Sequence, residues 1–202
     1  MTYVCSPNNP TGSCASRARL EYLLGHASGV VILDEAYAEF AGESLIGRAA
    51  QSPGLLVVRT LSKAFGLAGL RVGYAVGSPA LVAEVEKSRG PYKVSAIAEE
   101  AAVCALESDR AWVKEKVAEV IASRERFSAE LRLLGLIPLR SDSNFVLVPL
   151  ANANDIAARM RSLGVALRPF ASLPAIGDAL RISIGPWSMM EEALAALEEC
   201  IR

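Results

Sequence analysis

A lysine, an acid and several hydroxyls lie in two short segments of this 202-residue sequence. Lys63 stands in the segment Thr60–Gly66, where threonine and serine side chains precede its amine. Asp34, 29 residues before Lys63, opens the segment Asp34–Tyr37 directly after an apolar run. An amine can bond covalently to an aldehyde, a buried carboxylate can keep a ring nitrogen protonated, and hydroxyls can donate to a phosphate. The combination predicts a site for pyridoxal 5'-phosphate, which offers all three groups.

Each of these groups also has an ordinary structural explanation when it is taken alone. A single lysine is usually a solvated surface residue, and an aspartate at a strand end often caps the turn that follows. Asn9 lies in Asn8–Gly12, a turn signal in itself. Arg71, eight residues after Lys63, adds a permanently charged fork that suits a phosphate. It is the combination that favours a cofactor site.

Charge and hydrophobicity limit the classes of partner. Lys and Arg number 21 against 22 Asp and Glu, and this balance argues against a nucleic acid or a membrane surface. No apolar run approaches the ~20 residues of a spanning helix, and the first residues lack the pattern of a signal peptide. The four cysteines are scattered without a C-x-x-C pair, so no metal site is predicted. We expect a cytoplasmic protein with small-molecule partners.

The first half of the sequence alternates short apolar runs with helical patterns. Strands are predicted at residues 3–5, 30–34, 55–60 and 72–76, and helices at 16–24, 78–86 and 95–106. Continuous apolar character is typical of strands that helices cover on both faces, in a parallel or mixed sheet. The predicted fold class is therefore α/β.

The pattern changes near Ser108. A long amphipathic helix is predicted over residues 109–134, followed by strands and helices of a small α+β lobe: a strand at 145–148, a helix at 154–163, and strands at 165–168 and 180–184. Ser188–Glu191 matches a capping box for a last helix. We predict a cofactor domain over residues 1–107 and a small domain over 108–202, joined by a helix because no Pro/Gly-rich linker is present.

Four ordered segments resemble the class I/II aminotransferases of fold type I. They are Ser6–Gly12, Asp34–Tyr37, Thr60–Tyr74 and Leu180–Gly185. Within that superfamily the sequence is most similar to the histidinol-phosphate aminotransferase family. Pro91–Ser95 is similar to a further segment of that family, although Lys93 replaces its usual asparagine.

The resemblance implies a role for each cofactor residue. Lys63 would carry the cofactor covalently and move the proton between the substrate α-carbon and the cofactor. Asp34 would pair with the ring nitrogen, while Tyr37 and Asn9 would hydrogen-bond its phenolate oxygen. The phosphate would be held by Thr60, Ser62 and Arg71.

The resemblance also implies substrate residues in the second half. Arg181 corresponds to the arginine that binds an anionic group of the substrate, and Arg168, thirteen residues earlier, matches a second arginine. Asn144 matches an asparagine of the small lobe. Two arginine forks suit a phosphate on one substrate and the carboxylates of glutamate on the other.

Full-length members of the resembled family are longer on the N-terminal side and form homodimers. The sequence therefore resembles a C-terminal portion: part of the large mixed-sheet cofactor domain plus the small α+β domain. The expected activity is transamination between histidinol phosphate and 2-oxoglutarate. Two alternatives stay open, a threonine-phosphate decarboxylase and a catalytically silent fragment that pairs with another chain. Tyr92 favours the aminotransferase, because the decarboxylases tend to carry tryptophan there.

Overall fold

The computed structural model describes residues 1–201, which form two compact units. Unit 1 comprises Met1–Asn8 and Cys14–Val117, and unit 2 comprises Asn9–Ser13 and the residues from Ala118 on. Each unit has its own sheet with helices packed on it, so the predicted α/β class is confirmed. The domain boundary predicted at residue 107 stays a prediction.

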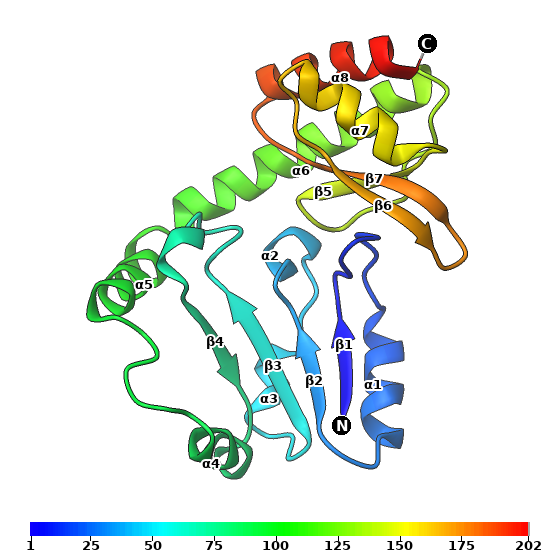
Figure 1. Ribbon diagram of the computed structural model, residues 1–202. Helices are drawn as coiled ribbons and strands as arrows, with labels where there is room; N and C mark the ends of the chain where they lie inside the picture. The colour runs from blue at the N-terminus through cyan, green and yellow to red at the C-terminus, as the bar shows by residue number, and fades with distance from the viewer. Residues whose placement is uncertain (202) are drawn as a thin grey trace. The chain divides into compact units, whose positions relative to one another are not determined.

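Unit 1 is built on a four-stranded mixed sheet (Figure 1). Its strands are β1 (Thr2–Cys5), β2 (Val31–Asp34), β3 (Leu55–Thr60) and β4 (Gly73–Val76), in that spatial order. β1, β2 and β3 run parallel, and β4 is antiparallel to β3. Each strand ends at the residue predicted from the sequence and begins within one residue of the predicted start.

Side chains alternate between the two faces of this sheet, because successive residues of a strand point to opposite sides. One face carries the buried residues Val31, Leu33, Leu55 and Val57. They pack with Leu20 of helix α1 (Arg17–His26) and Ala49 of helix α3 (Ile46–Ala49). The strand register places Asp34 and Val58 side by side on the other face.

Serine caps start three of the helices in unit 1. Ser16, Ser78 and Ser95 each accept a hydrogen bond from a backbone N–H of the first turn of α1, α4 (Pro79–Lys87) and α5 (Ala96–Ser108). Such caps satisfy N–H groups that a helix cannot pair internally, which is why the sequence predicted these starts. The short helix α2 (Ala38–Ala41), like α3, and the 3₁₀ turn η1 (Ala68–Leu70) were not predicted.

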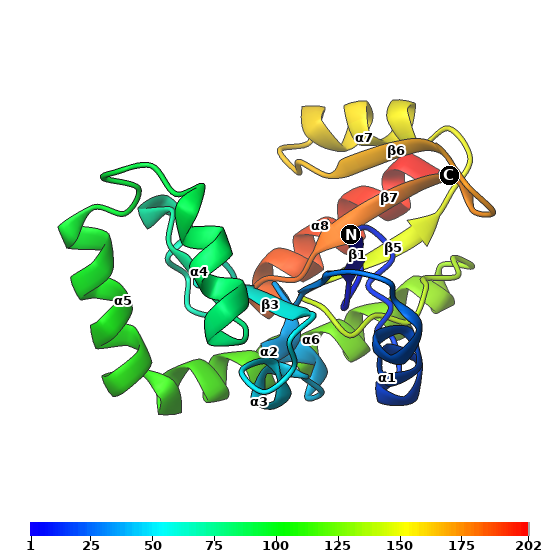
Figure 2. The same ribbon diagram turned by 90° about the horizontal axis from the view of Figure 1, so that it is seen from below.

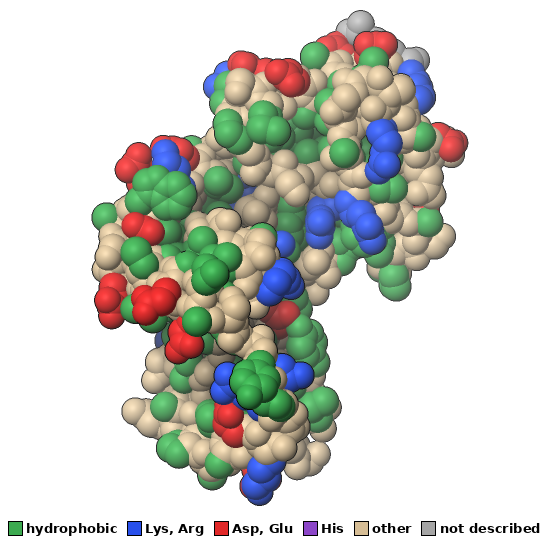
Figure 3. Space-filling model, turned by 60° about the vertical axis from the view of Figure 1, so that its left-hand side comes forward, with side chains coloured by type: hydrophobic (Ala, Val, Ile, Leu, Met, Phe, Trp, Pro, Cys, Tyr) green, Lys and Arg blue, Asp and Glu red, His purple; other side chains and the backbone are tan. Residues whose placement is uncertain are grey.

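Hydrophobic side chains also lie among charged ones on the surface, as one face in Figure 3 shows. Tyr92, in the stretch that leads into α5, is 99% exposed, and Ile97, in the first turn of α5, is 77% exposed. Helix α6, which follows α5, spans Arg110–Leu133, close to its predicted extent.

No helix among residues 1–201 is long and apolar enough to cross a membrane.

Unit 2 contains a three-stranded antiparallel sheet in the order β5 (Phe145–Pro149), β7 (Gly177–Ser183) and β6 (Arg168–Leu173). Helices α7 (Ala153–Ser162) and α8 (Trp187–Ile201) lie on one side of it, and in the view from below β7 passes in front of α8 (Figure 2). The core between them is apolar, with members such as Val146, Leu180, Ile182 and Leu197.

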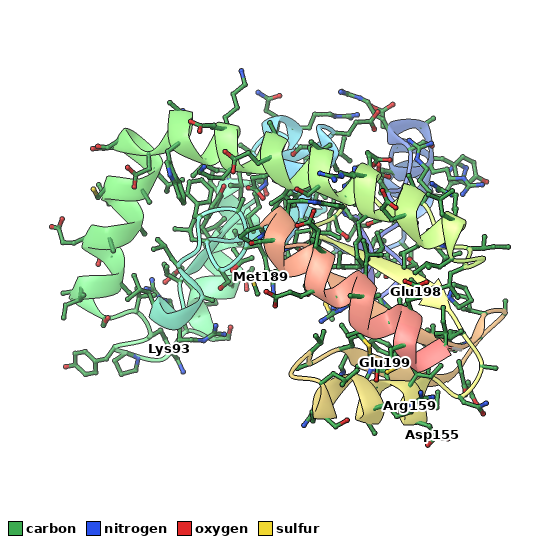
Figure 4. The ribbon with its side chains drawn as sticks, turned by 90° about the horizontal axis from the view of Figure 1, so that it is seen from above. Lys93, Asp155, Arg159, Met189, Glu198 and Glu199 are labelled. Atoms are coloured by element: carbon green, nitrogen blue, oxygen red, sulfur yellow. The ribbon has the colours of Figure 1, made fainter. Side chains whose placement is uncertain are left out.

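Helix α7 is fastened to α8 by one arginine. Arg159 donates from Nη1 to the carbonyl of Cys200 (2.7 Å) and from Nη2 to the carbonyl of Glu199 (3.2 Å). Figure 4 shows Arg159 and Glu199 close together on the two helices. Because the last carbonyls of a helix have no partner within it, the guanidinium satisfies groups at the C-terminal end of α8.

Two predictions for unit 2 are wrong. The strand predicted at residues 165–168 begins only at Arg168. Val165 and Leu167 lie in the connection before the strand, and their apolar side chains pack on the core of unit 2. The capping box predicted at Ser188 is also wrong. Helix α8 starts at Trp187, and the carbonyl of Pro186 accepts its first hydrogen bonds.

Candidate active site

The predicted cofactor residues of unit 1 gather at the carboxyl edge of its parallel strands. Asp34 is the last residue of β2, and Thr60 is the last residue of the neighbouring strand β3. The register pairs Asp34 with Val58, so Thr60 lies two residues further along on the same face. Ligands of α/β sheets bind in the loops that follow this edge.

The Asp34 carboxylate is held by two donors. Oδ1 accepts the backbone N–H of Ala36 at 2.9 Å, so the side chain does cap the turn after β2. Oδ2 accepts the hydroxyl of Tyr3, which lies on β1. This hydrogen bond to Asp34, together with burial and the negative charge of the carboxylate, raises the pKa of Tyr3 well above its usual range. Tyr3 was not predicted as a site residue, because its contact with Asp34 depends on strand register.

The Lys63 side chain is exposed just beyond the end of β3. Its Nζ lies 5.6 Å from the centre of the Tyr37 ring, and Tyr37 itself is 6% exposed. Across residues 1–201, no carboxylate pairs with this amine. The structure therefore brings Lys63 and Tyr37 together and keeps the amine out of ion pairs.

The predicted phosphate residues follow in the same loop. Thr60 Oγ1 accepts the backbone N–H of Ser62 at 3.1 Å, which fixes the turn that leads to Lys63. Arg71 has a left-handed backbone, with φ of 55°, and donates from Nη1 to the carbonyl of Ala68 at 2.9 Å. Since a guanidinium has five N–H donors, the exposed Arg71 keeps several for an anion. This donor set fits a phosphate.

Glu35, the neighbour of Asp34, points to the other face of the sheet and has a structural task. It is 2% exposed, and its Oε2 accepts Nε and Nη2 of Arg59 at 3.0 and 2.8 Å. The Ser44 hydroxyl and the Leu45 N–H donate to the same carboxylate at 2.6 and 2.8 Å. Glu35 thus ties β2 to β3 and to the loop before α3.

Glu39 also belongs to this buried network, but only one of its two carboxylate oxygens has a partner there. Its Oε1 lies 3.4 Å from Nη1 of Arg59, and its Oε2 is buried without a hydrogen-bond partner among residues 1–201. Burial raises the pKa of Glu39, and the nearby Arg59 only partly offsets this. For Arg59, burial lowers the pKa, but the hydrogen bonds and charge of Glu35 outweigh it and the net direction is upward.

The predicted substrate arginines lie directly opposite each other in unit 2. Arg168 of β6 pairs in register with Arg181 of β7, so both side chains leave the same face of the sheet. Leu147 of β5 follows on the same face, whereas Val146 and Ile182 face the helices. Like charges placed opposite each other destabilise a sheet unless an anion lies near them.

The Arg181 guanidinium has a defined position. Nη1 donates to Oδ1 of Asn9 at 2.6 Å, and the central carbon lies 5.0 Å from the centre of the Phe145 ring. Nε is buried and has no hydrogen-bond partner among residues 1–201. A buried N–H without an acceptor costs free energy, so the position suits a negatively charged group.

Two asparagines predicted for the site also lie in unit 2. Asn9 belongs to a segment, Asn9–Ser13, that this unit holds through Arg181 and through a hydrogen bond from the N–H of Asp142 to the carbonyl of Gly12 (2.8 Å). Asn144 precedes β5, and its carbonyl accepts the N–H of Ile184 at 2.9 Å. The contact of Asn9 with a cofactor and the role of the Asn144 side chain stay predictions.

Comparison with known proteins identifies the family of the chain. Residues 1–197 match the model of the aminotransferase class I and II family, and the chain belongs to this family. Its fold is that of the C-terminal portion of fold type I aminotransferases.

The matched relatives are considerably longer than this chain. Histidinol-phosphate aminotransferase of Caldanaerobacter subterraneus subsp. tengcongensis is 36% identical over 202 residues, which make up 100% of this chain and 57% of the relative. The crystal structure of histidinol-phosphate aminotransferase from Sinorhizobium meliloti in complex with pyridoxal-5'-phosphate matches with a TM-score of 0.88 and 31% identity. That match covers 99% of this chain and 57% of the other.

A decarboxylase structure is similar too. L-threonine-O-3-phosphate decarboxylase from Porphyromonas gingivalis has a TM-score of 0.86 and 26% identity, over 98% of this chain and 63% of that one. The chain thus spans little more than half the length of the relatives it matches.

Proposed function

We propose that this chain carries the lysine, the ring-nitrogen carboxylate and the substrate arginines of a pyridoxal-phosphate-dependent aminotransferase that acts on histidinol phosphate and 2-oxoglutarate. The observation that carries the proposal is the pair Arg168 and Arg181, opposite in register, with the Nε of Arg181 buried and unpaired. A cytoplasmic location and a homodimer, both implied by the resemblance, are part of the proposal.

The residues of unit 1 would hold the cofactor and move the proton. When bound, pyridoxal 5'-phosphate supplies an electron-withdrawing ring that eases removal of a proton from the α-carbon of the substrate amine. Asp34 keeps a proton on the ring nitrogen, because a carboxylate favours the positively charged form. The Lys63 amine, which no carboxylate of residues 1–201 neutralises through an ion pair, takes the α-proton and returns it.

The remaining predicted residues orient the cofactor. Tyr37 lies against the Lys63 side chain and can donate to the phenolate oxygen, as can Asn9. Thr60, Ser62 and Arg71 would bind the phosphate, with Arg71 as the fixed positive charge.

The arginines of unit 2 would select the substrates. A phosphate presents oxygens to two guanidinium forks at once, and each carboxylate of 2-oxoglutarate matches one fork. Since both reactants carry anionic oxygens, one pair of arginines can serve both halves of the reaction.

A threonine-phosphate decarboxylase is the second candidate. The similarity to the enzyme from Porphyromonas gingivalis supports it, and its substrate also carries a phosphate that the arginines could bind. Tyr92 favours the aminotransferase by the resemblance described above. Its side chain is 99% exposed, so it is free to contact another molecule.

The experiment compares the two reactions directly. The purified chain, with pyridoxal 5'-phosphate, is given histidinol phosphate and 2-oxoglutarate, and glutamate is measured. Carbon dioxide released from threonine phosphate is measured in parallel. Glutamate formation that requires both reactants supports the proposal, and carbon dioxide alone supports the decarboxylase. Neither product, with no absorbance change on adding cofactor, would identify a silent chain and refute both.

A further inference from the structure

Tyr3 lies where its side chain can orient the Asp34 carboxylate. In the register of β1 and β2, Tyr3 pairs with Ile32, and Cys5 pairs with Asp34. Paired residues of neighbouring strands share a face, so Tyr3 and Asp34 project from the same side of the sheet. The tyrosine ring extends along the strand by two residues, and its hydroxyl donates to Oδ2 of Asp34.

The two hydrogen bonds to Asp34 hold the plane of its carboxylate in one orientation. Ala36 N–H binds Oδ1, and the Tyr3 hydroxyl binds Oδ2, so rotation of the carboxylate plane would break both hydrogen bonds. Each carboxylate oxygen has two acceptor positions, and one on each oxygen stays available for a further donor. An N–H in front of Asp34 would therefore meet an oriented acceptor.

From this geometry we infer that Tyr3 is a positioning residue of the cofactor site, which holds the Asp34 carboxylate toward the ring nitrogen of pyridoxal 5'-phosphate. Tyr3 touches no reacting atom and acts through Asp34 alone. Its hydroxyl keeps its proton, and so stays a donor, because the neighbouring carboxylate disfavours the phenolate. The inference rests on the proposed function.

The first test needs no cofactor. The ring carbons of the five tyrosines are labelled with carbon-13, and their chemical shifts are followed by NMR as pH rises. The Tyr3 signal, identified by its loss in Tyr3→Phe, should titrate at higher pH than tyrosine in a short unstructured peptide. In Asp34→Asn it should move to lower pH, because the charge that disfavours the phenolate is gone. A Tyr3 signal that titrates like tyrosine in the unstructured peptide and does not respond to Asp34→Asn would overturn the inference.

The second test measures cofactor affinity by absorbance in a double-mutant cycle. Tyr3→Phe removes one hydrogen bond to a charged group and should weaken binding about tenfold or more. In the Asp34→Asn background the same substitution should change affinity little, because the carboxylate it positions is absent. Tyr22→Phe is the matched control: this exposed tyrosine stacks on His26 and should change neither measurement.

Additive losses in the cycle would show that Tyr3 acts independently of Asp34 and would overturn the inference. If the unsubstituted chain binds no cofactor, the proposed function fails. The titration without cofactor still decides whether Tyr3 holds the carboxylate.

Discussion

Arg59→Met should strongly destabilise the protein, because it leaves the Glu35 carboxylate buried without its positive partner. Glu35 is 2% exposed, and the Arg59 side chain is 15% exposed. Removal of one partner from a buried ion pair costs about 3–5 kcal/mol. Glu35 keeps the Ser44 hydroxyl and the Leu45 N–H as donors, so we expect the lower end of that range, about 3 kcal/mol.

The assay is urea unfolding followed by circular dichroism. The midpoint should fall while the dependence on urea concentration stays the same, which indicates a change in stability alone. Arg89→Met is the matched control. Its pair with Glu86 is 51% and 54% exposed, and such surface pairs contribute at most about 1 kcal/mol.

A second substitution tests the cause. In Glu35→Gln/Arg59→Met no charge is left at position 35, and the amide oxygen can still accept the Leu45 N–H. This double variant should regain at least half of the lost stability. If it is as unstable as Arg59→Met, or if Arg59→Met costs less than about 1 kcal/mol, the loss does not come from an unpaired buried charge.

Further predictions concern the site and the buried network. Lys63→Ala should abolish covalent attachment of pyridoxal phosphate, as seen by mass spectrometry after borohydride reduction; a label remaining on another lysine would contradict the assignment. Asp34→Asn should keep the far-ultraviolet spectrum but lower any transamination rate by orders of magnitude, and equal rates would rule out its role. Arg181→Gln should raise the KM for histidinol phosphate about tenfold or more, whereas Arg161→Gln, on the exposed surface of α7, should not. Glu39→Gln should gain stability relative to the unsubstituted chain as pH rises from about 4 to 7. Burial raises the pKa of Glu39, so the folded state binds more protons in this window and the unsubstituted chain loses stability across it; a constant difference in unfolding free energy would contradict this.

Local signals in the sequence were sufficient to predict most of the helices and strands. The apolar runs that end at Asp34 and Thr60 are strands that end at these residues, because a polar side chain marks where the sheet core stops. Ser78 and Ser95 marked helix starts through their caps. Helices α2 and α3, with four residues each, are too short to show a periodicity and went unpredicted.

One strand was predicted wrongly because apolar residues outside the sheet also pack on the core. Val165 and Leu167 pack on the core of unit 2 from a connection, and the strand begins only at Arg168. A short apolar run has the same appearance whether it is a strand or a buried loop, since both bury side chains. The prediction of the start of α8 was wrong for another reason. Its first hydrogen bonds go to the Pro186 carbonyl, and a Ser-x-x-Glu pattern that begins within the first turn of a helix has the same spacing as a capping box.

The sequence alone determined which side chains are predicted to do the chemistry. Residue type and local spacing predicted the Lys63 amine and the Asp34 carboxylate, and the family resemblance implied Arg168 and Arg181. The tertiary structure decided how they are held. It turned Glu35 away from Asp34, placed the Tyr3 hydroxyl on Asp34, and joined Asn9 to Arg181 across 172 residues of sequence. Such contacts depend on strand order and register, which are fixed when distant segments pack together and have no signature in any short stretch of chain.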